Sequence, residues 1–208
     1  LTIFITWLIF FSRSLFTRSI YYLDDLKIIF YPLEYAYAQF QQSFSLPQWS
    51  PYFGFGQPLL SWGQLGFFTP LHLILRFFRL HPLTLLQVSI LSYFALGLLG
   101  TYCFLKYLRL SQGASSLGAI MYVFTGFHVG HLNHVNFYTS TMLLPWLLLA
   151  LTLFFKKPSV KKAVLVSLIT AGIALSGQPQ IATYTCAIAL VYSATIFIAK
   201  LAKPSLKP

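Results

Sequence analysis

The sequence is poor in charged residues, above all in acidic ones. Only 8% of its 208 residues are charged, and Asp and Glu together number three. A soluble globular domain carries about 25% charged residues, so three carboxylates cannot solubilise a surface of this size. The shortage excludes a cytosolic enzyme and a disordered tail. The two cysteines both lie in apolar segments, which excludes a disulfide scaffold.

Long uncharged runs take the place of the missing charges. Residues 83–105 carry no charge and would form about 34 Å of helix, enough to cross a bilayer core about 30 Å thick. The run 163–199 is too long for one crossing, and Gly177-Gln178-Pro179-Gln180 predicts a break in it; a single kinked helix is the alternative. The sequence therefore predicts an all-α integral membrane bundle of one domain. Its expected helices are the end of a first helix at 1–12 and transmembrane helices at 83–105, 114–130, 139–155, 163–176 and 181–199.

The basic residues predict how this bundle is oriented. Nine of the fourteen lie in the short segments 106–113, 156–162 and 200–208, whereas the short segments 131–138 and 177–180 hold none. Lysine and arginine mark cytoplasmic loops, so the long segment 13–82 is expected to be external. The lipid bilayer, rather than nucleic acid, is then the partner that explains a net charge of +11.

The external segment 13–82 holds all three acidic residues. Pro32 predicts the start of a helix running to about Gln42, and residues 70–80 predict a second helix too short to span. Both suit the membrane surface, because they are short and rich in aromatic or apolar residues. Arg76 and Arg79 would share one face at i, i+3. They either extend to lipid headgroups or hold a substrate phosphate.

Three polar clusters, distant in sequence, are expected on this outer side: Asp24 with Asp25, the histidine-rich segment 128–136, and Gln178 with Gln180. They predict one outward-facing polar cavity roofed by 13–82, since irregular backbone at membrane depth is tolerated where it lines a cavity.

Each polar cluster has an alternative interpretation. Asp24 and Asp25 are either a solvated helix cap or functional acids, the second being favoured because acids near membranes are rare. The spacing His128-x2-His131-x2-His134 suits a metal site but also neutral, hydrogen-bonded interfacial histidines. Gln178 and Gln180 would bind a ligand or satisfy backbone groups left by Pro179.

Several strings of residues together resemble a known family. Asp25 and Pro32 are followed by LPQWSPY at 46–52, GFGQPLL at 54–60 and GFFTPL at 66–71; FTGFH, LPW and GQPQ follow later in the chain. In this order they resemble the N-terminal part of the bacterial YfhO family. Gln178 stands where a His is common in that family, and Ser50 where an Asn is common.

The resemblance implies a GT-C-type glycosyltransferase fold, in the bacterial inner (cytoplasmic) membrane, with a long external first loop. Such enzymes transfer a sugar from a polyprenyl-phosphate-linked donor to an envelope acceptor, here a glycan, a teichoic acid or a protein. Asp25, helped by Asp24, would act as general base or as ligand of a divalent cation such as Mg or Mn. The residues expected to contact donor phosphate or sugar are Arg76, Arg79, His131, His134, Gln178 and Gln180.

Two other classes of protein fit the same features. A transporter or flippase of lipid-linked saccharides also needs an outward cavity and a broken helix, although no internal repeat is visible. A non-catalytic membrane subunit of an envelope-assembly complex is the other alternative.

Overall fold

A computed structural model of the chain describes residues 1–17, 19–42, 48–51, 54–64 and 66–202. The described regular structure is almost entirely helical. A two-residue strand pair, β1 with β2, runs antiparallel with Trp49 opposite Pro58. In chain order the elements are α1 (Thr2–Phe16), the π-helical turn η1 (Leu26–Phe30), α2 (Tyr31–Gln42), β1 (Trp49–Ser50), β2 (Gln57–Pro58), α3 (Leu59–Trp62), α4 (Pro70–Phe77), α5 (Pro82–Tyr107), α6 (Gln112–Val123), α7 (Gly126–Gly130), α8 (Val135–Lys156), α9 (Val160–Ala174) and α10 (Pro179–Ala202).

Three of the described helices, α5, α8 and α10, are long and apolar enough to cross a membrane. They have 26, 22 and 24 residues, which corresponds to about 33–39 Å of helix. The chain is thus a multi-pass membrane protein with three candidate spans.

The helices expected at 114–130 and 163–176 are shorter than a span. The first is divided into α6, of 12 residues, and α7, because the side chain of Thr125 accepts a hydrogen bond from the backbone N–H of His128 and starts a new helix. The second becomes α9, of 15 residues, about 22 Å at the helical rise. Neither α6 nor α9 is therefore long enough by itself to cross a bilayer core of about 30 Å.

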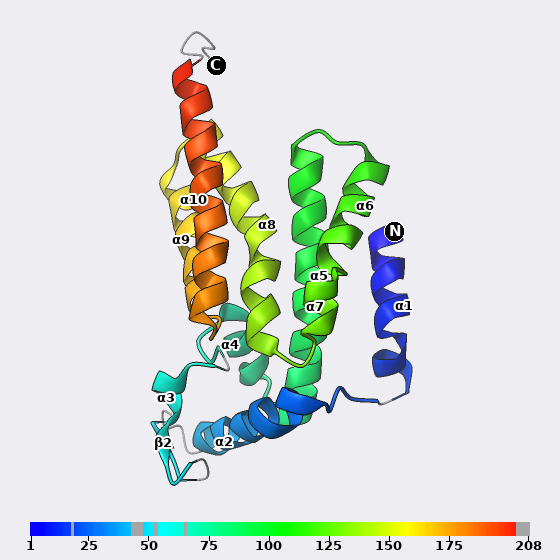
Figure 1. Cartoon of the computed structure of the whole chain (residues 1–208), viewed down its shortest axis with the longest axis vertical. Helices are drawn as coiled ribbons and strands as arrows, with labels where there is room; N and C mark the ends of the chain where they lie inside the picture. Colours follow the sequence, from blue (N-terminus) through cyan, green and yellow to red (C-terminus); the bar gives the residue numbers. More distant parts are fainter. Residues whose placement is uncertain (18, 43–47, 52–53, 65, 203–208) are drawn as a thin grey trace.

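Figure 1 shows the long helices side by side, with α2, α3, β2 and α4 gathered at one end, where α2 runs across the ends of the bundle helices. The α7–α8 connection lies at the same end. The α9–α10 connection lies there too, and α9 and α10 run in opposite directions from it. We call this the loop end; it comprises the described residues of 17–82, 131–134 and 175–178.

The basic residues of the short segments lie at the opposite end of the bundle, at the α5–α6 and α8–α9 connections and near the end of α10. They are Lys106, Arg109, Lys156, Lys157, Lys161, Lys162 and Lys200; Lys203 and Lys207 lie outside the described residues. The side of the membrane on which each end lies stays a prediction.

The main core surrounds α5. Ile90, Tyr93 and Phe94 of α5 are buried against residues of α1, α2, α6 and α8, and a smaller core joins α8 to α9 and α10. Gly100 permits the close approach of α5 and α8, since a Cβ there would lie 2.5 Å from Nε1 of Trp146. The same indole N–H donates to the carbonyl of Leu96 at 2.9 Å. These contacts make α5 the central helix of the bundle.

Candidate functional site

A partly exposed cluster at the loop end joins two segments that lie 109 residues apart in sequence. We call it the acidic cluster; its members are Asp24, Asp25, Asn133 and His134. His134 Nε2 lies 3.1 Å from Asp25 Oδ2, and Asn133 Nδ2 donates to Asp24 Oδ2 at 3.3 Å. The structure thus brings together the first two of the three polar clusters expected from the sequence.

Local backbone geometry places the two carboxylates. Asp24 adopts a positive φ of 43°, a conformation that aspartate tolerates better than most residues. Asp25 then stands at the N-cap of η1, but its side chain makes no capping hydrogen bond. The structure therefore differs from the helix-cap alternative, because the Asp25 carboxylate turns to His134 instead.

Burial is uneven within the acidic cluster. The side chains of Asp25 and His134 are 36% and 29% exposed. His134 Nδ1, in contrast, is buried and has no hydrogen-bond partner among the described residues. When Nε2–H donates to Asp25, the imidazole holds the carboxylate from one side and its other nitrogen faces the protein. Asp25 is thus the member of this pair that a ligand from outside can reach.

The other two histidines of the 128–134 string hydrogen-bond to partners other than the acidic pair. His128 is 4% exposed, and its two ring nitrogens lie 2.9 Å from the carbonyl of Tyr122 and the hydroxyl of Thr141. His131 Nδ1 donates to the carbonyl of Phe127 at 2.7 Å, and its ring lies 5.3 Å from that of His134.

These positions do not fit a metal site. Within the described parts of the chain, no three His, Cys, Asp or Glu side chains come together in a way that could hold a metal ion. The interfacial, hydrogen-bonded alternative describes His128 and His131 better than the metal-site interpretation. The divalent cation expected on Asp25 finds no such ligand set there either.

Gln178 and Gln180 lie at the α9–α10 connection. Gln180 Nε2 donates to the hydroxyl of Tyr184 one turn further along α10, at 3.0 Å. The connection packs against the segment before α4: Gly177 has a φ of 90°, and a Cβ there would lie 2.5 Å from the carbonyl oxygens of Gly63 and Gln64. Among the described residues, neither glutamine hydrogen-bonds to Asp25 or His134, so the third polar cluster shares only the loop end with the other two.

Sequence reasoning missed a second, buried group of polar and charged residues, which we call the buried cluster; it consists of Glu34 of α2 with Thr69, His72 and Arg76. Arg76 donates to Glu34 Oε1 at 2.8 Å, and their side chains are 7% and 2% exposed. His72 Nε2 lies 3.9 Å from the same oxygen. The cluster fastens α2 to α4 beneath the surface of the loop end.

Aromatic and hydroxyl groups enclose the buried cluster. The Arg76 guanidinium lies 4.3 Å from the ring centroid of Phe67 and 4.9 Å from that of Tyr37, distances typical of cation–π contacts. On the far side, Tyr93 of α5 donates to the hydroxyl of Thr69 at 3.2 Å, and that hydroxyl lies 2.9 Å from His72 Nδ1. Hydrogen bonds therefore link α2 to α4 through Glu34 and Arg76, and α5 to the start of α4 through Tyr93 and Thr69, while His72 Nε2 between them has no hydrogen-bond partner among the described residues.

Burial shifts the ionisation of this cluster strongly. Loss of hydration raises the pKa of Glu34 to about 7, although the adjacent Arg76 charge and hydrogen bond act in the opposite direction. Burial, together with the Arg76 charge, lowers the pKa of His72 to about 3. His72 is thus neutral at physiological pH, and Glu34 titrates near neutrality.

The expectation that Arg76 and Arg79 share a helix face is wrong. α4 ends at Phe77, and Arg79 lies beyond it with a φ of 49°. Arg76 is buried against Glu34, whereas Arg79 is exposed. The chain reverses at Phe78 and Arg79, which directs the two guanidinium groups to different surroundings. Arg76 is therefore not a headgroup-contacting residue.

Comparison of the chain with models of protein families, with characterised proteins and with solved structures finds no match. The resemblance to the YfhO family therefore stays a prediction. Residues 46, 47 and 52 of its loop string lie outside the described residues. The structure itself supports an all-α, multi-pass membrane protein with an open acidic cluster and a buried ionic cluster at the same end.

Proposed function

We propose that this chain forms the membrane-embedded catalytic part of a GT-C-type glycosyltransferase. It would transfer a sugar from a polyprenyl-phosphate donor to an envelope acceptor on the outer face of the bacterial inner membrane. The observation that carries the proposal is the contact of the half-exposed Asp25 carboxylate with His134 at the loop end. A carboxylate held by one partner and open on another side suits proton abstraction from a hydroxyl group.

The proposed reaction needs one base and one leaving group. The acceptor oxygen forms a bond to the anomeric carbon of the sugar, and the bond from that carbon to the donor phosphate breaks. The bonding electron pair leaves with the lipid phosphate, and the acceptor proton passes to Asp25. General-base catalysis of this kind contributes about 10²–10⁴-fold in rate.

His134 would act as the positioning residue for Asp25. Its imidazole fixes one carboxylate oxygen at 3.1 Å, which leaves the carboxylate oriented before the acceptor arrives. Asp24, held by Asn133, keeps a second negative charge beside the site. The YfhO-like strings around this segment add support from the sequence, since they imply the same role for Asp25.

The test is sugar transfer by the complete protein in native membranes, with radiolabelled polyprenyl-phosphate glucose and polyprenyl-phosphate N-acetylglucosamine as donors. Asp25→Asn keeps the size of the side chain and removes its basicity, so transfer is expected to fall about 100-fold or more. Asp24→Asn, the matched change one residue earlier, is expected to lose less activity. Lys161→Gln, at the opposite end of the bundle, serves as the neutral control.

Wild-type transfer by Asp25→Asn would remove Asp25 from the reaction. Absence of transfer by the wild-type protein, combined with translocation of the lipid-linked sugar across vesicles, would establish the flippase alternative instead.

A further inference from the structure

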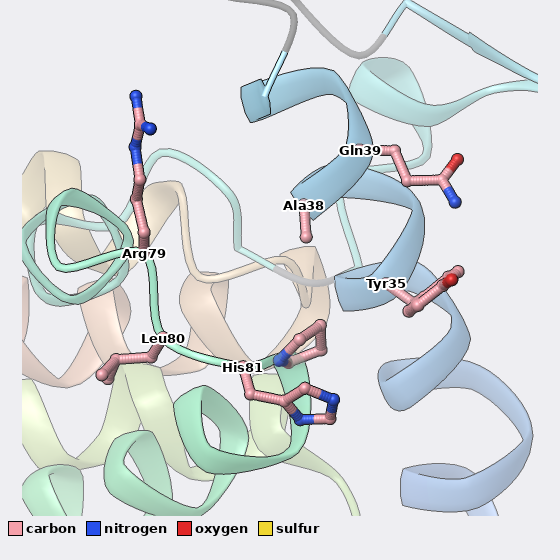
Figure 2. Close-up of a pocket in the computed structure, with 7 residues that line it drawn as sticks. Tyr35, Ala38, Gln39, Arg79, Leu80 and His81 are labelled. Atoms are coloured by element: carbon pink, nitrogen blue, oxygen red, sulfur yellow. The ribbon is translucent and has the colours of Figure 1, made fainter.

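A cleft of about 520 Å³ opens between α2 and the turn that joins α4 to α5. Figure 2 shows Tyr35, Ala38 and Gln39 on the α2 side and Leu80 and His81 on the other, with the long side chain of Arg79 extending from the turn in a different direction from the His81 ring. Its lining among the described residues comprises Tyr35, Ala38, Gln39, Arg79, Leu80, His81 and Pro82. None of these residues belongs to the acidic cluster or to the buried cluster.

The charge of this cleft suits an anion. Arg79 supplies a guanidinium, which is always protonated, and His81 adds an imidazole that can donate. Neither Asp nor Glu is among the lining residues. Glu34 directly precedes Tyr35 but is buried in its ion pair with Arg76.

The surroundings of the cleft suit a lipid. The exposed face of α4 and the residue after it are apolar: Leu73, Ile74, Phe77 and Phe78 are 46%, 58%, 83% and 65% exposed. The buried face of the same helix carries His72 and Arg76. This arrangement is the reverse of that of a water-facing helix, and it indicates that the outer face of α4 contacts acyl chains.

The position of the cleft along the bundle agrees with this. It lies where the candidate span α5 begins, at Pro82. The end of a span meets the headgroup region of the bilayer. A positively charged cleft beside exposed phenylalanines at that depth combines the two features of a lipid, an anionic head and apolar chains.

We propose that this cleft binds the phosphate headgroup of an anionic phospholipid, with Arg79 contacting the phosphate and Phe77 and Phe78 packing among the acyl chains. Arg79 is then a lipid-binding residue, distinct in role from the buried Arg76.

This lipid is separate from the proposed sugar donor. Tyr35 lies ten residues after Asp25 along η1 and α2, about 15 Å at the helical rise. The phosphate of a reacting donor is bonded directly to the anomeric carbon and must lie close to the base. The cleft therefore does not hold the reacting phosphate while Asp25 acts, and the proposal stands without the proposed transferase activity.

The chain offers a matched pair of arginines for the test. Arg79 and Arg109 both follow a helix end with a positive φ, 49° and 66°. The backbone N–H of Arg79 donates to the carbonyl of Arg76 at 2.9 Å, and that of Arg109 donates to the carbonyl of Lys106 at 3.0 Å. Arg79→Gly and Arg109→Gly remove the same charge and relax the same backbone conformation. Only the first change alters the cleft.

The experiment titrates the purified complete protein in detergent with dioctanoyl phosphatidylglycerol and follows binding by native mass spectrometry. Dioctanoyl phosphatidylcholine and inorganic phosphate form the comparison arms. Wild type and Arg109→Gly are expected to bind phosphatidylglycerol equally, and Arg79→Gly about tenfold more weakly, the effect expected for one charge-assisted contact.

Equal loss in the two glycine variants would show a general charge effect and overturn the site, as would unchanged binding by Arg79→Gly. Binding of phosphatidylcholine at the same affinity would overturn the preference for an anionic lipid. Equal binding of inorganic phosphate would overturn the lipid assignment. No sugar donor enters the assay, so its outcome does not depend on the test of Asp25.

Discussion

The acidic cluster and the buried cluster lie at the same end of the molecule, and each sets a carboxylate against a histidine. His134 Nε2 is 3.1 Å from Asp25, and His72 Nε2 is 3.9 Å from Glu34. The side chain of Asp25 is 36% exposed, however, whereas that of Glu34 is 2% exposed and also bonded to Arg76. Burial rather than residue type therefore separates the two clusters.

The difference decides what each cluster can do. A carboxylate in contact with solvent can meet a substrate and exchange its proton with little effect on folding. A buried carboxylate bonded to a buried guanidinium cannot lose its partner without leaving an isolated charge in an apolar environment. The acidic cluster is thus the candidate for chemistry, and the buried cluster is the candidate for holding the loop end together.

The largest expected effect comes from breaking the buried cluster. Glu34→Ala leaves Arg76 without its carboxylate partner, and we expect a loss of about 3–5 kcal/mol in the free energy of unfolding. Unfolding of the purified protein by increasing fractions of a denaturing detergent measures the loss.

The matched control replaces both partners by apolar residues. Glu34→Leu combined with Arg76→Met removes both charges and is expected to recover most of the stability lost by Glu34→Ala. A double variant as unstable as Glu34→Ala would show that packing, not the unpaired charge, causes the loss.

The second effect concerns pH. The pKa of Glu34 rises from 4.5 to about 7 on folding, so its contribution to stability is complete below pH 4.5 and is lost as the pH rises to about 7. The pKa of His72 falls from 6.5 to about 3. Its contribution is therefore complete above pH 6.5 and is lost as the pH falls towards 3. Between pH 4.5 and 6.5, Glu34 therefore makes stability fall with rising pH, whereas His72 makes it rise.

Single variants should separate the pH dependence of stability due to Glu34 from that due to His72. Relative to wild type, Glu34→Gln is expected to become progressively more stable as the pH rises from 4.5 to 7, because it lacks the falling contribution of Glu34. His72→Asn is expected to become progressively less stable relative to wild type as the pH rises from 3 to 6.5. Melting temperatures at half-unit pH steps give both curves, and parallel curves for all three proteins would contradict the assigned shifts.

The smallest expected effect comes from the acidic cluster. His134→Gln removes a partly exposed contact to Asp25, and we expect a change below about 1 kcal/mol in the free energy of unfolding. The same variant should lower sugar transfer through a lower kcat rather than a higher KM, because the imidazole orients the base. A loss of stability as large as that of Glu34→Ala would place His134 among the structural residues instead.

Several elements of the fold follow from local patterns. The uncharged run before Lys106 predicts α5, and Pro32 predicts a helix that ends at Gln42, as α2 does. The expected helix at 70–80 is shorter in the structure, since α4 ends at Phe77. No periodic pattern could show the chain reversal at Arg79, because its φ of 49° is unusual for a residue with a side chain.

The sequence could predict which residues belong to the acidic cluster, but not which side chains contact one another. The scarcity of acids drew attention to Asp24 and Asp25, and His134 was expected on the same side. The sequence could not pair Glu34 with Arg76, since 42 residues separate them and both could equally face water. A lone acid in the first turn of a predicted helix carries no signal of burial.

By itself the sequence determined that this protein belongs in a membrane, because a chain with 8% charged residues and long apolar runs cannot remain soluble. It also determined where the long helices lie, since hydrophobic length is a local property of the chain. Only the tertiary structure decided which charges are buried and which are open. Burial depends on which segments pack over one another, and that arrangement is what places Glu34 under α4 and leaves Asp25 at the surface beside His134.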